Sequence, residues 1–304
     1  MSADQHSHNH HDHDHDQAPK VTNGNERRVL GAMVLTAGFM VAEIAGGILS
    51  GSLALIADAG HMATDAAALA LAFIAFRLAA RPANPNQSYG YHRAETLAAF
   101  VNALAMITLV AWIIYEAIMR FFEPHAILGG MMLWVAVGGL IVNIIAFTLL
   151  HSGDRENLNM RGAAVHVLGD LLGSVAAIAA AIIIILTGWT PIDPILSVLV
   201  ALLILRSALS LAKQSGHILM EGTPRGLDLE NVRSDIETHV RGVEDVHHIH
   251  AWSLTATRNV ITLHVRIAGS ISGDEILKAI QDRLKERFNI GHATIQVETK
   301  ACIP

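Results

Sequence analysis

Six long apolar segments limit what this chain can fold into more than any other feature. A helix needs roughly 20 predominantly apolar residues to cross a bilayer. The segments cover residues 29–49, 53–79, 95–119, 127–150, 162–187 and 190–213, with polar interruptions in the second and third. Only 16% of the 304 residues are charged, against about 25% in soluble domains. The sequence therefore predicts an α-helical membrane protein with six transmembrane helices.

The distribution of arginine predicts how these helices are oriented. Loops on the cytoplasmic side of a membrane carry an excess of lysine and arginine. Arginines precede the first segment and flank the second and fourth connections, at Arg27, Arg28, Arg77, Arg81, Arg93, Arg155 and Arg161. The first and fifth connections carry none, and the third carries only Arg120. We therefore expect both termini in the cytoplasm.

The chain divides into three regions. Residues 1–28 form a polar tail, residues 29–215 the membrane domain and residues 216–304 a soluble domain. The tail interleaves aspartates with six histidines, His6, His8, His10, His11, His13 and His15. Such a tract cannot bury a core, so we expect it to be disordered. We interpret it as a loose metal-capturing segment, and the alternative is a tail that only aids solubility.

The soluble domain has the pattern of a small α+β fold. Residues 228–240 and 272–288 are predicted helices, and residues 245–255, 258–268 and 292–298 are predicted strands. Ser272, followed three residues later by Glu275, predicts a capping box at the start of the second helix. The order αββαβ predicts an open sheet with two helices on one face.

Two identically spaced histidine–aspartate pairs lie inside the apolar segments. They are His61 with Asp65, and His166 with Asp170. A charged group at the centre of a membrane helix costs roughly 2.5–3.5 kcal/mol on insertion scales, and residues four apart share a helix face. If the second and fifth helices face each other, two nitrogens and two oxygens converge in a set that suits tetrahedral Zn²⁺ better than Mg²⁺ or Ca²⁺. The alternative is that the pairs only hold helices together by hydrogen bonds.

Other polar residues of the apolar segments receive structural interpretations. Asp58 lies three residues before His61, where it can support the site from behind, cap a helix or act as a fifth ligand, and we favour the first two. We expect Asn102 and Asn143 to make hydrogen bonds between helices rather than to bind metal. Glu43 is interpreted in the same way, with contact to the ion path as the alternative.

Two glycines follow the second pair in the fifth segment. Gly169 and Gly173 are four residues apart, a spacing of small residues that lets helix backbones approach closely. We expect close helix packing there, and a hinge is the alternative.

The soluble domain carries a second group of metal-binding side chains. Apolar residues alternate from position 261 to 267, so His264 is expected on the opposite face of its strand. Alternation likewise separates Gln296 and Glu298 from the apolar positions of the last strand. A metal shared by His264 and Glu298 is therefore possible, and solvated strand residues are the alternative. Three histidines of the neighbouring strand are candidates to join, and alternation does not select among His247, His248 and His250.

Four stretches together resemble a known family. HMATD (61–65), HVLGD (166–170), YGYHRAE (89–95) and VHHIHAWSL (246–254) are similar to those of the cation diffusion facilitators, in particular the bacterial zinc and zinc/cadmium efflux branch. The resemblance implies a homodimeric divalent-cation/proton antiporter with a ferredoxin-like cytosolic domain. It also implies that His61, Asp65, His166 and Asp170 form the transport site. Histidine rather than aspartate at position 61 implies a preference for Zn²⁺, often with Cd²⁺, over manganese and iron.

The resemblance further implies sites outside the membrane. His247, His264 and Glu298 would form a cytosolic metal site near the dimer interface. His92 and His292 would form a weaker peripheral site. Arg93 and Glu221 would join the membrane and soluble domains by a salt bridge, and two separate exposed charges are the alternative.

These observations predict a proton-coupled Zn²⁺ exporter, with Cd²⁺ as a second cargo, in the bacterial inner membrane. Imidazole binds metal only when neutral, and its ordinary pKa is about 6.5, so metal release and proton uptake are linked. Helix rocking would expose the site to each side in turn. Zn²⁺ would also bind at the cytosolic site.

Other classes of protein fit less well. A passive channel would be slowed by a four-ligand site, and a membrane-anchored metal sensor would not need Asp65 or Asp170. A zinc enzyme usually keeps one coordination position open, so we expect no enzyme activity. The basic residues form no cluster, so we expect no nucleic-acid partner.

Overall fold

The computed structural model describes most of the chain. The residues it describes are 23–151, 158–255, 257–268 and 272–300, with the backbone alone at 23–30, 150–151 and 158–168. The histidine-rich tract of the predicted tail lies outside the described residues. So does the side chain of His166, although its backbone lies within a described helix.

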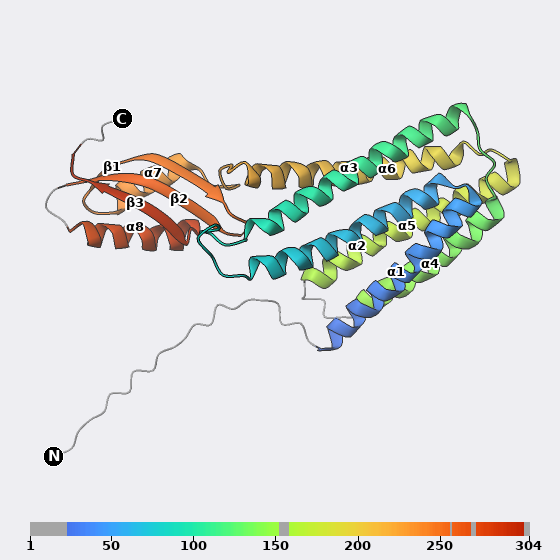
Figure 1. Ribbon diagram of the computed structural model, residues 1–304, viewed down its shortest axis with the longest axis horizontal. Helices are drawn as coiled ribbons and strands as arrows, with labels where there is room; N and C mark the ends of the chain where they lie inside the picture. The colour runs from blue at the N-terminus through green and yellow to red at the C-terminus, as the bar shows by residue number, and fades with distance from the viewer. Residues whose placement is uncertain (1–22, 152–157, 256, 269–271, 301–304) are drawn as a thin grey trace, which may run out of the picture.

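Six helices in the described part of the chain are long and apolar enough to cross a membrane. They are α1 (Asn23–Ser50), α2 (Leu53–Ala79), α3 (Arg93–Phe122), α4 (Gly129–His151), α5 (Leu158–Thr187) and α6 (Ile192–Leu219). Each coincides with one of the six predicted apolar segments, although α4 and α6 begin two residues later than predicted, which confirms the predicted number of spans. The last helix continues beyond residue 213 through polar residues, toward the soluble domain (Figure 1).

The six helices run roughly along the long axis of the molecule, and the soluble domain lies beyond one end of them (Figure 1). Helix α3 packs along α6, and α4 packs against both α1 and α5. Small side chains fill the buried contacts of α2, with Ala54 near Ala177 and Ala181 in one cluster and Ala57 near Ala201 in another. Since small residues let membrane helices approach closely, these alanines allow α2 to pack near its neighbouring helices.

A buried carboxylate fastens the start of α2 to the start of α6. Asp193 is fully buried and accepts hydrogen bonds from the hydroxyl of Ser52 at 2.5 Å and from the backbone N–H groups of Leu53 at 2.7 Å and Ala54 at 3.2 Å. Ser52 is the N-cap of α2, and its hydroxyl accepts from the Leu55 N–H. The positive end of a helix dipole favours a carboxylate at this position.

The soluble domain is a three-stranded sheet covered by two helices. Its elements are α7 (Leu229–His239), β1 (Val243–Ser253), β2 (Asn259–Ile267), α8 (Gly273–Phe288) and β3 (His292–Glu298). The strand order is β1-β2-β3, with β1 antiparallel and β3 parallel to β2. Val232 and Ile236 of α7 and Ile280 of α8 enter one apolar core with the sheet, so both helices cover the same face. The predicted αββαβ order is confirmed.

The predicted capping box at α8 is wrong in detail. Ser272 is the N-cap residue, but its side chain makes no capping hydrogen bond. Instead, its backbone carbonyl accepts from the N–H of Glu275 at 3.2 Å. The last turn of α8 carries Lys285 and Arg287, which interact favourably with the negative end of the helix dipole.

Ion pairs to one buried carboxylate tie α7 to α8. The Asp235 side chain is only 3% exposed and accepts hydrogen bonds from the guanidinium of Arg283, at 2.8 Å from Nη2 to Oδ1. Arg287 Nε lies 2.9 Å from the same Oδ1. The hydrogen bonds from Arg283 lower the pKa of Asp235 below its ordinary value, and Arg287 adds to the effect.

We expect Asp235→Asn to lower the free energy of unfolding of the soluble domain by about 1–3 kcal/mol at neutral pH, because two cations lose a charged acceptor. Asp235 has a lower pKa in the folded state, so its contribution is present above the unfolded pKa of about 3.9 and is lost as pH falls further. Urea unfolding between pH 3 and 7 measures this dependence. The matched control is Asp274→Asn on the exposed first turn of α8, and equal loss in both variants would contradict the prediction.

Candidate metal centre

The first intramembrane pair forms as the sequence predicted. His61 and Asp65 lie one turn apart on α2, with 3.6 Å between His61 Nε2 and Asp65 Oδ2. Their side chains are 20% and 31% exposed, so both are partly shielded within the bundle. This spacing leaves the imidazole and the carboxylate able to approach one ion.

A cavity of about 430 Å³ lies between α2, α5 and α6 and is lined by one residue of each predicted pair, His61 and Asp170. Asp58 and His61 reach it from α2, and Asp170 reaches it from α5. The rest of its lining is largely apolar and includes Leu199 and Leu203 of α6. The structure therefore brings His61 and Asp170 to a common space from helices about a hundred residues apart. His166 lies one turn before Asp170 in α5, with its side chain outside the described residues.

Asp58 is part of this cavity rather than a helix cap. Helix α2 begins at Leu53 and is capped by Ser52, so the cap interpretation of Asp58 is wrong. Its carboxyl group interacts with that of Glu43 of α1, and Glu43 is only 3% exposed. Glu43 is thus one contact away from a side chain that lines the cavity, which connects α1 to the site.

The two asparagines of the apolar segments have different hydrogen-bond partners. Asn143 of α4 donates to the Ser174 hydroxyl of α5 at 3.2 Å, so the predicted interhelical bond is confirmed there. Asn102 instead contacts Met106 of its own helix at 3.7 Å, and that prediction is wrong.

The two glycines of α5 do not lie in a close contact between helices. A Cβ added at Gly169 would meet nothing within 4 Å, and one at Gly173 only Asp58 at 3.9 Å. Both glycines line the cavity, so the close-packing interpretation is wrong.

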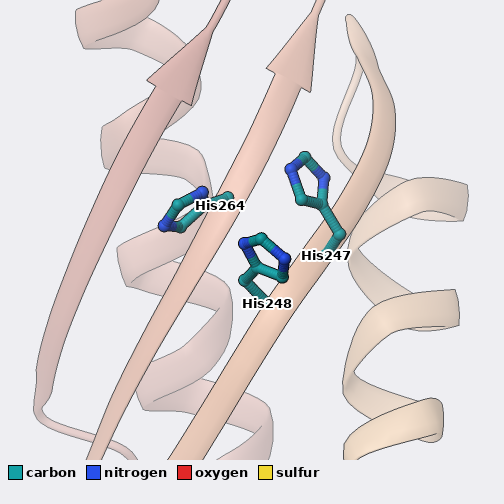
Figure 2. Close-up of side chains that lie close together, drawn as sticks. All are labelled: His247, His248 and His264. Atoms are coloured by element: carbon teal, nitrogen blue, oxygen red, sulfur yellow. The ribbon is translucent and has the colours of Figure 1, made fainter. Parts of the chain in front are cut away.

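Three histidines of the soluble domain, His247, His248 and His264, meet on the sheet face opposite the core (Figure 2). His247 on β1 is directly opposite His264 on β2, with their ring centroids 5.5 Å apart. Glu298 at the end of β3 places Oε1 2.9 Å from His264 Nδ1 and Oε2 3.4 Å from His247 Nε2. The structure therefore brings the three predicted residues together within one chain.

Neighbouring polar groups hold this cluster in place. Gln296 donates to Glu298 Oε1 at 2.8 Å, and His247 Nδ1 lies 2.9 Å from Asp245 Oδ2. Carboxylates that approach the far nitrogen of a metal-binding histidine orient the ring and raise its basicity. Asp245 occupies that position relative to His247.

The two peripheral histidines have other contacts. His92 Nε2 lies 2.7 Å from Arg258 Nη1, and His292 makes an edge-on ring contact with Tyr89, with centroids 5.8 Å apart. A metal at this position would have to displace the Arg258 cation from His92. The predicted bond between Arg93 and Glu221 is confirmed at 2.9 Å, and it joins α3 to the segment that follows α6.

Comparison with known proteins identifies the family. Residues 29–220 match the family model for the cation efflux transmembrane domain, and residues 224–300 match that for the cation efflux protein cytoplasmic domain. The chain belongs to the cation efflux family. These matches cover the membrane domain with its cavity and the soluble domain with its histidine cluster. The protein is thus a multi-pass membrane protein of a family that transports metal cations out of cells.

Relatives of this cation efflux protein carry transporter names. A protein named zinc transporter ZitB from Pectobacterium atrosepticum is 53% identical over 281 residues, covering 92% of this chain and 88% of the relative. ZitB from Escherichia coli is 51% identical, with 92% and 90% covered. A Bacillus subtilis protein named cadmium, cobalt and zinc/H⁺–K⁺ antiporter is 43% identical, with 91% and 90% covered.

Two residues of this cation efflux protein could not be identified from its sequence alone: the histidine of β1 that faces His264, and the aspartate that contacts the start of α2. The choice among His247, His248 and His250 was open because strict alternation was assumed for β1, whereas the strand has an irregularity between His247 and His250. Asp193 was not singled out in the sequence. Its position before Pro194 gave no sign that it reaches the start of α2.

Proposed function

We propose that this protein exports Zn²⁺, and also Cd²⁺, from the bacterial cytoplasm across the inner membrane in exchange for protons. The observation that carries the proposal is the cavity shared by His61 and Asp170. An imidazole and a carboxylate from two separate helices meet there at the depth of the membrane helices. The names of the relatives support zinc as cargo and an antiport mechanism.

The proposed transport site consists of His61, Asp65, His166 and Asp170. Two imidazoles and two carboxylates match the donors and the coordination number that Zn²⁺ prefers. Each pair occupies one helix, so a relative movement of α2 and α5 changes all the distances between the pairs. This arrangement suits an ion that is bound on one side of the membrane and released on the other.

Histidine supplies the link between metal and protons. At a cytoplasmic pH near 7.5, imidazole is largely neutral and able to bind metal, because its ordinary pKa is about 6.5. A more acidic periplasm protonates the same group, and metal is released. Alternating access by helix rocking then converts a pH difference into metal export.

The soluble domain completes the proposal. We assign a cytosolic Zn²⁺ site to His247, His264 and Glu298, and a homodimer in which this domain forms part of the interface. Both termini lie in the cytoplasm in this arrangement. His92 and His292 remain candidates for a weak peripheral site, subject to the contact between His92 and Arg258.

Zinc flux in proteoliposomes under a controlled pH gradient tests the coupling. With the membrane potential clamped by K⁺ and valinomycin, an acidic interior should draw Zn²⁺ in while an internal dye reports loss of protons. A difference of one pH unit can sustain about a tenfold zinc ratio for each proton exchanged. Nigericin, which collapses the pH gradient, should abolish accumulation. Equal zinc movement with and without the gradient would show a passive pathway.

A further inference from the structure

The polar face of β1 carries two histidines in succession. Val246, Ile249 and Ala251 contact the apolar core, so the two residues between Val246 and Ile249 do not reach it. In a regular strand, neighbouring side chains point to opposite faces. Here His247 and His248 are placed on the same side of the sheet, beside His264 (Figure 2).

A β-bulge causes this departure from alternation. His247 is opposite His264 and His250 is opposite Thr262, so three steps along β1 match two along β2. His248 is the extra residue, and its φ of 49° lies in the left-handed region. Residues other than glycine seldom adopt that conformation, and such backbone strain tends to persist where function requires it. The bulge turns the His248 imidazole toward the cluster.

Three imidazoles therefore gather where the proposed cytosolic site uses two, those of His247 and His264. The ring centroid of His248 lies 5.2 Å from that of His247 and 5.0 Å from that of His264. One ligand nitrogen from each ring lies within 4.8 Å of the other two. Ligand atoms of a tetrahedral zinc site with bonds of about 2.0–2.1 Å are about 3.4 Å apart. Small rotations of the exposed His248 ring and the two partly buried rings close the difference.

We propose that His248 is a fourth ligand, which completes a three-histidine, one-glutamate Zn²⁺ site within a single subunit. The inference rests on the cytosolic site proposed above and extends it. Three nitrogens and one carboxylate oxygen fill the coordination shell of a structural zinc ion. The site then binds zinc without a ligand from a second subunit, and its occupancy follows cytosolic zinc rather than dimer formation.

Zinc titration of the full-length protein in detergent, against a chromophoric chelator, tests this assignment. All variants carry Asp65→Ala and Asp170→Ala, so that the transport site does not compete. Asparagine tolerates positive φ, so His248→Asn removes the imidazole and keeps the bulge. We expect it to weaken the tightest site at least tenfold. His250→Asn, on the same strand but outside the cluster, should change the affinity less than twofold.

Two further measurements separate the possible outcomes. His264→Asn should abolish the tight site, and if it does not, the cytosolic site itself is wrong and this inference falls with it. If His264→Asn abolishes the site while His248→Asn leaves the affinity unchanged, only the fourth ligand is wrong. The melting temperature without zinc should be equal for His248→Asn and its parent, while the rise produced by zinc should be smaller in the variant. An equal rise would overturn the proposal.

Discussion

Replacing Asp170 by asparagine should reduce zinc flux in proteoliposomes to the level of protein-free vesicles. Asp170 is the residue through which α5 reaches the cavity it shares with His61, and an amide is a much weaker zinc ligand than a carboxylate. Loss of groups that only support a metal ligand costs roughly 10–100-fold in metal binding, so loss of a ligand should cost at least about 100-fold. The proton signal from the internal dye should disappear together with the zinc signal.

Asparagine also separates this role from a structural one. An amide still makes hydrogen bonds between helices, so a residue that only holds α2 and α5 together should tolerate the change. Asp274→Asn is the matched control, since it makes the same chemical change at an exposed position of the soluble domain. Unchanged flux in Asp170→Asn, at normal insertion and melting temperature, would mean that the metal path lies elsewhere.

The second large effect is expected at Asp193. Its replacement by alanine should destabilise the membrane domain by about 3–5 kcal/mol, because a buried charged acceptor is lost and its donors are left in place. Those donors are the Ser52 hydroxyl and the N–H groups of Leu53 and Ala54. In detergent, the melting midpoint followed by tryptophan fluorescence should fall by at least about 6 °C.

A double-mutant cycle with Ser52→Ala tests the mechanism of this loss. If Ser52 and Asp193 act in one cap, the double variant should be less destabilised than the sum of the single variants. Ser197→Ala provides a comparison on α6, because that hydroxyl is buried and donates only to the Asp193 backbone carbonyl. Strict additivity of Ser52→Ala and Asp193→Ala would contradict a shared cap.

The number of membrane helices and the αββαβ order of the soluble domain could be predicted because each depends on a local pattern. Long apolar runs gave the six spans, and alternation gave the face of His264 on β2, where the strand is regular. The same rule did not select His248, because a bulge depends on how β1 pairs with β2 rather than on the residues of β1 alone. Asp193 was not recognised because its partners lie 139 to 141 residues earlier in the chain.

In the intramembrane site, too, the local geometry could be predicted and the contacts between helices could not. The i to i+4 spacing was enough to predict that His61 and Asp65 share a face, since it is a property of one helix. The proximity of Asp170 was a hypothesis about packing, and it required the arrangement of α2, α5 and α6. Gly169 and Gly173 were read as contact residues because small residues often lie between helices, yet here small size leaves space for the cavity.

The bond network of Asp193 also restricts how the bundle can move. It joins α2 and α6 at the end of the membrane domain that lies away from the soluble domain (Figure 1). Because these hydrogen bonds join α2 and α6 at one end, the two helices cannot slide along each other. They can only change the angle between them, about the joined end. Of the three helices around the cavity, α5 is therefore the one whose displacement can widen the fastened end, whereas the opposite end can also widen as α2 and α6 diverge.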